Sequence, residues 1–368
     1  MFKTTFYNFD CMFKRQKWFN LTVSCGYDKH TVPIFRACAG SRIAPLFKTL
    51  LSSYCKNDCK FCAMRYERRT LRDRWKPIEF AKVAYKLWRM RKIEGVFLSS
   101  SVEKDPDYTV EKEIEAIELL RRMGFKEYIH LKIMPGTSRE LIKRATEISD
   151  RIGINIELPN KEHYEDMKLY LTFVQDILRR LRWISREVEK VQKEGGCKAG
   201  LDSQMVVGAS DETDKEIIEI SDQLFNKLNA RRVYYSRFDP IKNTPLENKE
   251  PENPWREYRL YQSSFLLRDY SFEAKDFVFD DDNRLNLSQD PKFLVAKEKE
   301  LRVDINDAEF NELIKVPGIG LKTAQNIINY RPIKDISKLK SLGVVLKRAS
   351  PFIEINNVHQ TTLSKWIN

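Results

Sequence analysis

The feature that most constrains the fold is an alternation of short apolar runs with amphipathic helical segments. Runs typical of buried strands cover residues 46–51, 95–101, 128–134, 152–158, 203–209 and 232–238. Segments with helical spacing lie between them, including one long predicted helix over 165–194. This alternation predicts βαβ units and a parallel sheet. Six strands suit an α/β fold with a partial, six-stranded parallel barrel better than a closed eight-stranded one.

Three cysteines follow the first predicted strand in a short loop. Cys55, Cys59 and Cys62 are separated by three and then two residues. Thiolates are the usual protein ligands of iron–sulfur clusters, and three of them leave the fourth iron of a four-iron cluster open. The spacing alone also allows part of a zinc site with a remote fourth ligand, or chance. The other cysteines form no second Cys-x-x-Cys pair, which argues against a four-cysteine zinc ribbon; they are Cys11, Cys25, Cys38 and Cys197.

The charge balance favours a polyanionic partner. The 368 residues include 65 Lys and Arg against 53 Asp and Glu, which gives a net charge of +12. The sequence contains no apolar window long enough to cross a bilayer and no apolar core of a signal peptide at its start. These features predict a cytoplasmic, reducing location without membrane attachment, where thiols serve metals rather than disulfides.

The domain organisation expected from the pattern has four parts. An N-terminal extension covers 1–45, the partial barrel 46–245, a structured connector 246–300, and a small all-α unit 301–368. In the last unit, two short helical segments flank Pro317-Gly318-Ile319-Gly320. Glycine tolerates positive φ and leaves backbone N–H groups bare, and a helix N-terminus attracts anions. Lys322 adds a positive charge just beyond this hairpin.

Two segments resemble known families. The cysteine loop, with Phe61 before the last cysteine, resembles the cluster loop of radical S-adenosylmethionine (SAM) enzymes. Val303–Arg331 resembles the helix-hairpin-helix module of DNA-binding proteins. The whole chain is similar to a subgroup described as DNA modification or repair radical SAM proteins with a C-terminal helix-hairpin-helix. Stretches such as Phe97–Ser101, Tyr128–Gly136 and Asn155–Pro159 carry this resemblance.

The resemblance implies roles for individual residues. Cys55, Cys59 and Cys62 would hold three irons of a [4Fe–4S] cluster, and SAM would chelate the fourth. The residues implied in SAM binding are Phe61, Ser99, Ser100, Ser101, Lys132, Asn155, Glu157, Gln204 and Gly208. Ser99–Ser101 replaces the glycine- and glutamate-containing motif of the superfamily, so hydroxyls and carbonyls would act there. Pro317, Gly318, Ile319, Gly320 and Lys322 would grip nucleic-acid phosphates.

Several of these residues also have purely structural interpretations. Lys132 could pair with Glu157, Gly208 could serve packing alone, and the serines could cap the following segment. The default for Cys25 and Cys38 is a buried free thiol, with a second metal site or radical quenching as alternatives.

The function implied is a radical SAM enzyme that modifies or repairs nucleic acid, DNA rather than RNA. An electron donor such as ferredoxin or flavodoxin would reduce the cluster. Two alternatives stay open: a radical SAM enzyme acting on tRNA or other RNA, and a non-enzymatic nucleic-acid-binding protein stabilised by zinc.

Overall fold

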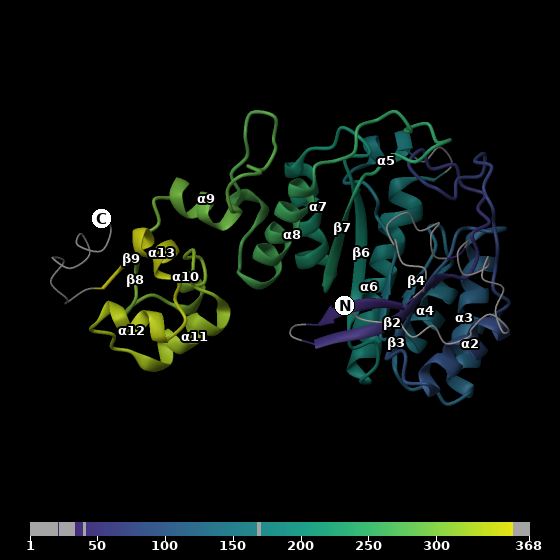
Figure 1. Cartoon of the computed structure of the whole chain (residues 1–368), viewed down its shortest axis with the longest axis horizontal. Helices are drawn as coiled ribbons and strands as arrows, with labels where there is room; N and C mark the ends of the chain where they lie inside the picture. Colours follow the sequence, from purple (N-terminus) through teal and green to yellow (C-terminus); the bar gives the residue numbers. More distant parts are fainter. Residues whose placement is uncertain (1–20, 22–33, 40–41, 168–170, 356–368) are drawn as a thin grey trace, which may run out of the picture. The chain divides into compact units, whose positions relative to one another are not determined.

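The computed structural model describes residue 21 and residues 34–39, 42–167 and 171–355. The chain divides into two compact units, each with buried apolar side chains of its own. The first reaches Glu212 and includes residues 226–252, and the second consists of residues 213–225 and the chain from Asn253 onward. Figure 1 shows the elements coloured along the chain. No helix among these described residues is long and apolar enough to span a membrane.

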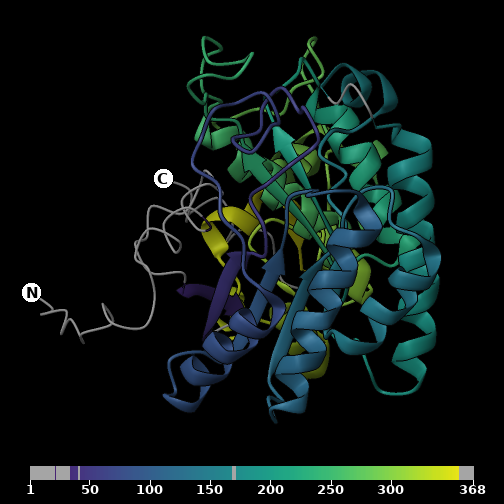
Figure 2. The same cartoon turned by 90° about the vertical axis from the view of Figure 1, so that its right-hand side faces the viewer.

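A seven-stranded sheet forms the base of the first unit, with spatial order β1 to β7 following chain order. β1 (Ile34–Ala39) pairs antiparallel with β2 (Arg42–Leu50), and all later pairs are parallel. The other strands are β3 (Gly95–Ser99), β4 (Tyr128–Lys132), β5 (Arg151–Gly153), β6 (Gly200–Val207) and β7 (Arg232–Arg237). Because successive strands are neighbours and the sheet curls, the result is a half-barrel (Figure 2).

Helices cover one face of this sheet, as both views show (Figures 1 and 2). They are α2 (Pro77–Arg89), α3 (Pro106–Arg122), α4 (Arg139–Ile148) and α6 (Arg179–Lys193). On β4, Ile129 and Leu131 are fully buried. His130 and Lys132 alternate with them and therefore project from the opposite face. That face of β4 therefore carries two buried polar side chains.

The six predicted parallel strands are confirmed as β2–β7, but two expectations were wrong. The antiparallel strand β1 was not predicted, so the sheet begins at Ile34 rather than at residue 46. The single helix expected over 165–194 is instead α5 (Lys161–Met167), a π-helix (Phe173–Leu178) and α6. Thr172 donates its N–H and its hydroxyl to the Asp176 carboxylate, at 2.8 and 3.1 Å. Such local bonds favour a new helix start over a continuous helix.

The second unit is mainly helical. Its elements are α8 (Pro254–Asp269), α9 (Pro291–Glu298), α10 (Phe310–Leu313), α11 (Leu321–Tyr330), α12 (Ile336–Ser341) and α13 (Leu346–Ala349), with parallel strands β8 (Val303–Asp304) and β9 (Ile353–Glu354). The first residues of α7 (Asp214–Leu228) also belong to it. An apolar core that includes Leu313, Ile319 and Ile327 joins α10, the predicted hairpin and α11. The two helical segments predicted about Pro317–Gly320 are therefore confirmed.

Candidate functional site

Backbone hydrogen bonds hold the cysteine loop against neighbouring segments. Lys56 N–H donates to the Val102 carbonyl at 2.8 Å, and Lys60 N–H donates to the Met167 carbonyl at 3.0 Å. The Lys60 ammonium also pairs with Asp166 at 2.7 Å. The loop is therefore tied both to the segment after β3 and to the end of α5.

The sulfurs of Cys55 and Cys62 accept backbone hydrogen bonds. Asn57 N–H lies 3.4 Å from Cys55 Sγ, and Met64 N–H lies 3.3 Å from Cys62 Sγ. Cys59 is buried, whereas Cys55 and Cys62 are half-buried. Hydrogen bonds to the sulfurs stabilise their negative charge and help set the reduction potential of iron–sulfur clusters. The donor chemistry of this loop therefore fits a cluster of the kind predicted.

The described residues contain no group of three or more His, Cys, Asp or Glu side chains that could hold one metal ion. Ligands of a single zinc ion must all approach the same centre. The cysteines of a four-iron cluster each bind a different iron, so their sulfurs need not share one centre.

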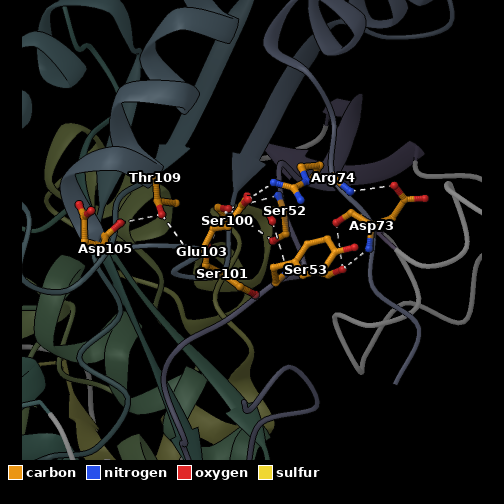
Figure 3. A network of polar contacts seen from close by, with 10 residues as sticks. Ser52, Ser53, Asp73, Arg74, Ser100, Ser101, Glu103, Asp105 and Thr109 are labelled. Carbon is orange, nitrogen blue, oxygen red and sulfur yellow. Dashed lines mark hydrogen bonds and ion pairs between the residues drawn. The ribbon is translucent and has the colours of Figure 1, made fainter. Parts of the chain in front are cut away.

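Serines link the ends of β2 and β3. Ser101 N–H donates to the Ser52 carbonyl at 2.9 Å, and Ser52 N–H donates to the Ser100 hydroxyl at 3.2 Å. The Ser100 hydroxyl in turn donates to the Ser101 carbonyl at 3.0 Å. Figure 3 shows this network extending through Ser53 to Asp73. The Ser100 hydroxyl, the Ser101 N–H and carbonyl, and the Ser99 carbonyl, which accepts from Leu51 N–H at 2.7 Å, all therefore take part in joining the two strand ends.

Asn155 and Glu157 lie side by side after β5. Asn155 Nδ2 donates to Glu157 Oε1 at 3.4 Å, while Asn155 Oδ1 is buried and has no hydrogen-bond partner in the part of the chain that the structure describes. Glu157 has a φ of 62°, which is uncommon for a residue other than glycine. Its N–H and carbonyl bond to Gln204 and Val206, at 2.9 and 2.8 Å. An orphaned acceptor beside a carboxylate suits the paired hydroxyls of a ribose.

Phe61 packs against a small apolar cluster of Val206, Ala209 and Phe238. This places the aromatic ring of the cysteine loop against the segments that end β6 and β7. Gly208, in the same region, has a φ of 88°, and any Cβ there would collide with Glu252. Its N–H donates to the buried Glu212 carboxylate at 2.5 Å. The packing reason for this glycine is therefore present, whatever its role toward a ligand.

Lys132 is engaged by a partner that the sequence did not indicate. Its ammonium lies 2.7 Å from Asp202 Oδ2, and His130 Nε2 lies 3.1 Å from both oxygens of the same carboxylate. Burial opposes ionisation of Asp202, but His130, Lys132 and Arg151 outweigh it and hold the pKa of this carboxyl well below its usual range. Burial lowers the pKa of the His130 imidazole despite the opposing effect of Asp202. The pairing of Lys132 with Glu157, the structural alternative, is not what the structure shows.

Gly153 explains why this network was missed. It lies on β5, between Lys132 on β4 and Asp202 on β6. A Cβ at this position would overlap the Asp202 carboxylate. Only a glycine allows the carboxylate to reach across β5 to β4. A glycine inside a strand often marks such a close approach, so Gly153 was the available signal.

The hairpin of the second unit lies between α10 and α11. Gly318 has a φ of 86°, whereas Gly320 has a φ of −98° and is the N-cap of α11. Only the first of the two glycines therefore uses the left-handed region. Lys322 is exposed in the first turn of α11. Exposed N–H groups at a helix start, with a lysine beside them, form an anion-binding arrangement.

Comparison with protein families agrees with this geometry. Residues 49–224 match the family model of the radical SAM superfamily, and residues 298–345 match that of the helix-hairpin-helix motif. The chain therefore carries a radical SAM domain, which is an enzyme domain, followed by a helix-hairpin-helix motif. Members of this superfamily use a [4Fe–4S] cluster and SAM. A search of curated proteins gave no match.

Several solved structures are similar to this chain. HydG, a maturase of the [FeFe]-hydrogenase, is 12% identical with a TM-score of 0.47, covering 60% of this chain and 48% of its own. Methylornithine synthase (PylB) is 15% identical with a TM-score of 0.48, covering 73% and 67%. The radical SAM methyltransferase TsrM from Kitasatospora setae is 12% identical with a TM-score of 0.41, covering 62% and 45%. The chain thus spans about half the length of HydG and TsrM.

Proposed function

We propose that this protein cleaves SAM reductively at a [4Fe–4S] cluster and directs the resulting radical chemistry to nucleic acid, DNA in preference to RNA. The observation that carries the proposal is the presence of a radical SAM domain and a helix-hairpin-helix motif in one chain. The net charge of +12 supports a polyanionic substrate. The reaction would either modify or repair a nucleotide.

Each residue near the cysteine loop has a proposed task in holding the cofactors. Cys55, Cys59 and Cys62 would ligate three irons of the cluster. When bound there, these cofactors would supply the radical chemistry that removes a hydrogen atom from the substrate. Phe61 would pack beside the adenine, on the apolar cluster at the ends of β6 and β7. The sheet around these residues would orient SAM and keep water away from the radical.

The remaining contacts to SAM would come from strand ends. The Asn155 Oδ1 atom, which has no partner among the described residues, and the Glu157 carboxylate would accept hydrogen bonds from the ribose hydroxyls. Backbone carbonyls of Ser99–Ser101 would face the SAM amino group, and Gln204 through Gly208 would line the adenine. Lys132, whose ammonium is paired with Asp202, would direct its remaining N–H donors to the SAM carboxylate.

The hairpin would hold the nucleic acid in position without distinguishing its sequence. The N–H groups around Gly318 and Gly320, with the Lys322 ammonium, would hold phosphates, which carry no sequence information. The radical acts on one nucleotide, so a base or sugar inside a duplex would have to be extruded or presented single-stranded. Affinity carried by phosphate contacts falls steeply with salt.

Anaerobic reconstitution tests the enzymatic part. With iron, sulfide, SAM and dithionite, the protein should become brown and release 5′-deoxyadenosine. Replacing Cys55, Cys59 and Cys62 by alanine should remove both the colour and the product. Absence of 5′-deoxyadenosine under every condition, or about one zinc and no iron per chain, would support the zinc-stabilised alternative instead.

The substrate is tested separately. Mass spectrometry of nucleosides from cells with and without the gene separates a modification from a repaired lesion. Binding to duplex DNA and to tRNA over a range of salt concentrations compares the two polymers. Equal or tighter binding of tRNA would favour the RNA-directed enzyme.

A further inference from the structure

A buried lysine from outside the helix-hairpin-helix motif contacts the hairpin. Lys292 is the second residue of α9, before the residues 298–345 that match the motif. Its side chain is only 9% exposed, and Nζ donates to the Ile319 carbonyl at 2.7 Å. The ammonium also lies 4.5 Å from the centre of the Tyr270 ring. Burial of a charged side chain is costly, so the position of Lys292 beside the hairpin calls for an explanation.

The contact with Lys292 helps to fix the orientation of the peptide groups at the tip of the hairpin. Gly318 accepts a hydrogen bond from Val345 N–H at 3.0 Å, and Ile319 accepts the one from Lys292. Both carbonyls at the tip are therefore held by the rest of the unit. In a trans peptide the C=O and the following N–H point in opposite directions. Fixing the Ile319 carbonyl against Lys292 therefore points the Gly320 N–H, at the start of α11, away from Lys292.

The Lys292 ammonium has donors to spare. An ammonium carries three N–H donors. In the described part of the chain, one of them bonds to Ile319, and the other recorded contact is with the face of Tyr270. A phosphate bound at the Gly320 N–H would therefore have, behind the Ile319–Gly320 peptide, a positive charge that forms no ion pair with a carboxylate of the described residues. The nearby Asp290 carboxylate lies 3.2 Å from Arg348.

Resting on the proposed nucleic-acid function, we propose that Lys292 is a positioning residue of the phosphate site: it orients the hairpin through Ile319 and places a positive charge behind it. On this proposal, α9 belongs to the nucleic-acid-binding module and is not merely a connector. Tyr270, which follows α8, belongs to the module for the same reason.

This geometry makes phosphate binding sensitive to pH near neutrality. Burial lowers the pKa of Lys292 to about 7, with Asp290 raising it and Arg348 lowering it. Within the described ranges, these two groups and the Tyr270 phenol are the titratable groups around the ammonium. A bound phosphate favours the protonated form and raises this pKa, so binding takes up a proton above pH 7. Affinity for nucleic acid should therefore fall as pH rises from 7, and level off at acid pH.

The test measures binding of the full-length protein to a fluorescent 20-base-pair DNA duplex between pH 6.0 and 8.5 at fixed salt. One linked proton allows at most a tenfold change per pH unit, so we expect the wild-type Kd to rise about tenfold over this range. Lys292→Arg keeps its charge at every pH and should bind with little pH dependence. Lys292→Met should bind about tenfold more weakly at pH 6.0 and also show little pH dependence. Lys297→Met removes an exposed charge from the same helix and should keep the wild-type pH profile.

Two results would overturn the inference. One is a wild-type pH profile in Lys292→Arg, a variant whose thermal unfolding can be compared directly with that of the wild type. The other is wild-type affinity in Lys292→Met. If wild-type protein binds no duplex at any pH, the nucleic-acid proposal itself fails and this inference with it. If Lys322→Met weakens binding while the Lys292 variants leave it unchanged, only the inference about Lys292 fails.

Discussion

At the scale of single residues, Asp202 is the centre of a buried polar network in the first unit. Its carboxylate is fully buried and contacts both His130 and Lys132. Removing one partner of a buried ion pair leaves an uncompensated charge, which costs about 3–5 kcal/mol. Replacing all partners by apolar groups often costs far less. Loss of one member of this network should therefore destabilise the protein strongly, whereas replacement of all its members by apolar side chains could be tolerated.

Asp202→Asn should lower the free energy of unfolding by about 3–5 kcal/mol, because it leaves Lys132 buried without a counter-charge. Urea unfolding at pH 7 measures this loss. The double variant Asp202→Asn with Lys132→Met should be more stable than Asp202→Asn alone, since the orphaned ammonium is gone. A double variant less stable than the single one would contradict this account.

The loss of stability in Asp202→Asn should also depend on pH. The pKa of Asp202 is depressed in the folded protein, so its stabilising effect is present above the unfolded value of about 3.9 and is lost as pH falls below it. The stability difference between wild type and Asp202→Asn should therefore be constant from pH 7 to about 5 and shrink in more acidic buffer.

Asn155 offers a second test, at the proposed SAM site. Asn155→Ala removes the buried acceptor Oδ1 and should weaken SAM binding about tenfold, the value of one hydrogen bond of about 1.4 kcal/mol. Asn155→Asp keeps an acceptor oxygen and should lose less. Calorimetry with the reconstituted protein measures both, and the iron content should stay at the wild-type level. Unchanged SAM affinity in Asn155→Ala would remove this residue from the site.

At the scale of elements, the sequence predicted what depends on local pattern. Buried parallel strands are near-continuous apolar runs, so β2 to β7 were recognisable. β1 was missed because Arg36 lies within Ile34–Ala39 and no long apolar run marks it. The cysteine loop and the hairpin were visible because their residue types and spacing carry the signal. The pairing of Lys132 with Asp202 was not, because it spans a third strand and depends on the sheet order.

The hairpin between α10 and α11 allows an internal comparison of two glycines. A Cβ at Gly318 would lie 2.7 Å from the Val345 carbonyl and require a φ of 86°, whereas one at Gly320 meets nothing closer than the Tyr270 hydroxyl at 3.8 Å. Gly318→Ala should therefore destabilise the second unit by about 2–4 kcal/mol, combining left-handed strain with a steric overlap. Gly320→Ala should unfold close to wild type. Thermal unfolding of both variants measures the difference, and similar losses would contradict the role assigned to Gly318.

At the scale of the whole molecule, the two compact units interrupt each other in sequence. Residues 213–225, which open α7, belong to the second unit, although the radical SAM match runs to residue 224. Asp214 explains part of this assignment. It accepts hydrogen bonds from Arg256 Nε at 2.7 Å and from Leu285 N–H at 2.8 Å, and both side chains of the ion pair are almost fully buried. The end of the family match therefore does not coincide with the boundary between the two compact units.

A chain truncated after residue 252 should consequently fail to form a stable radical SAM domain, even though it contains every residue of the family match. The truncation removes both partners of Asp214 and leaves the buried side chains of Ile217 and Ile218 without the unit they belong to.

A longer fragment, residues 1–290, keeps α8, Arg256 and Leu285, and is the matched control. We expect the shorter fragment to aggregate or to bind substoichiometric iron, and the longer one to be monomeric and bind iron like the full chain. Size-exclusion chromatography, circular dichroism and iron analysis compare the two. Equal stability of both fragments would show that the Asp214 contacts are dispensable and that the domain folds independently of everything after residue 252.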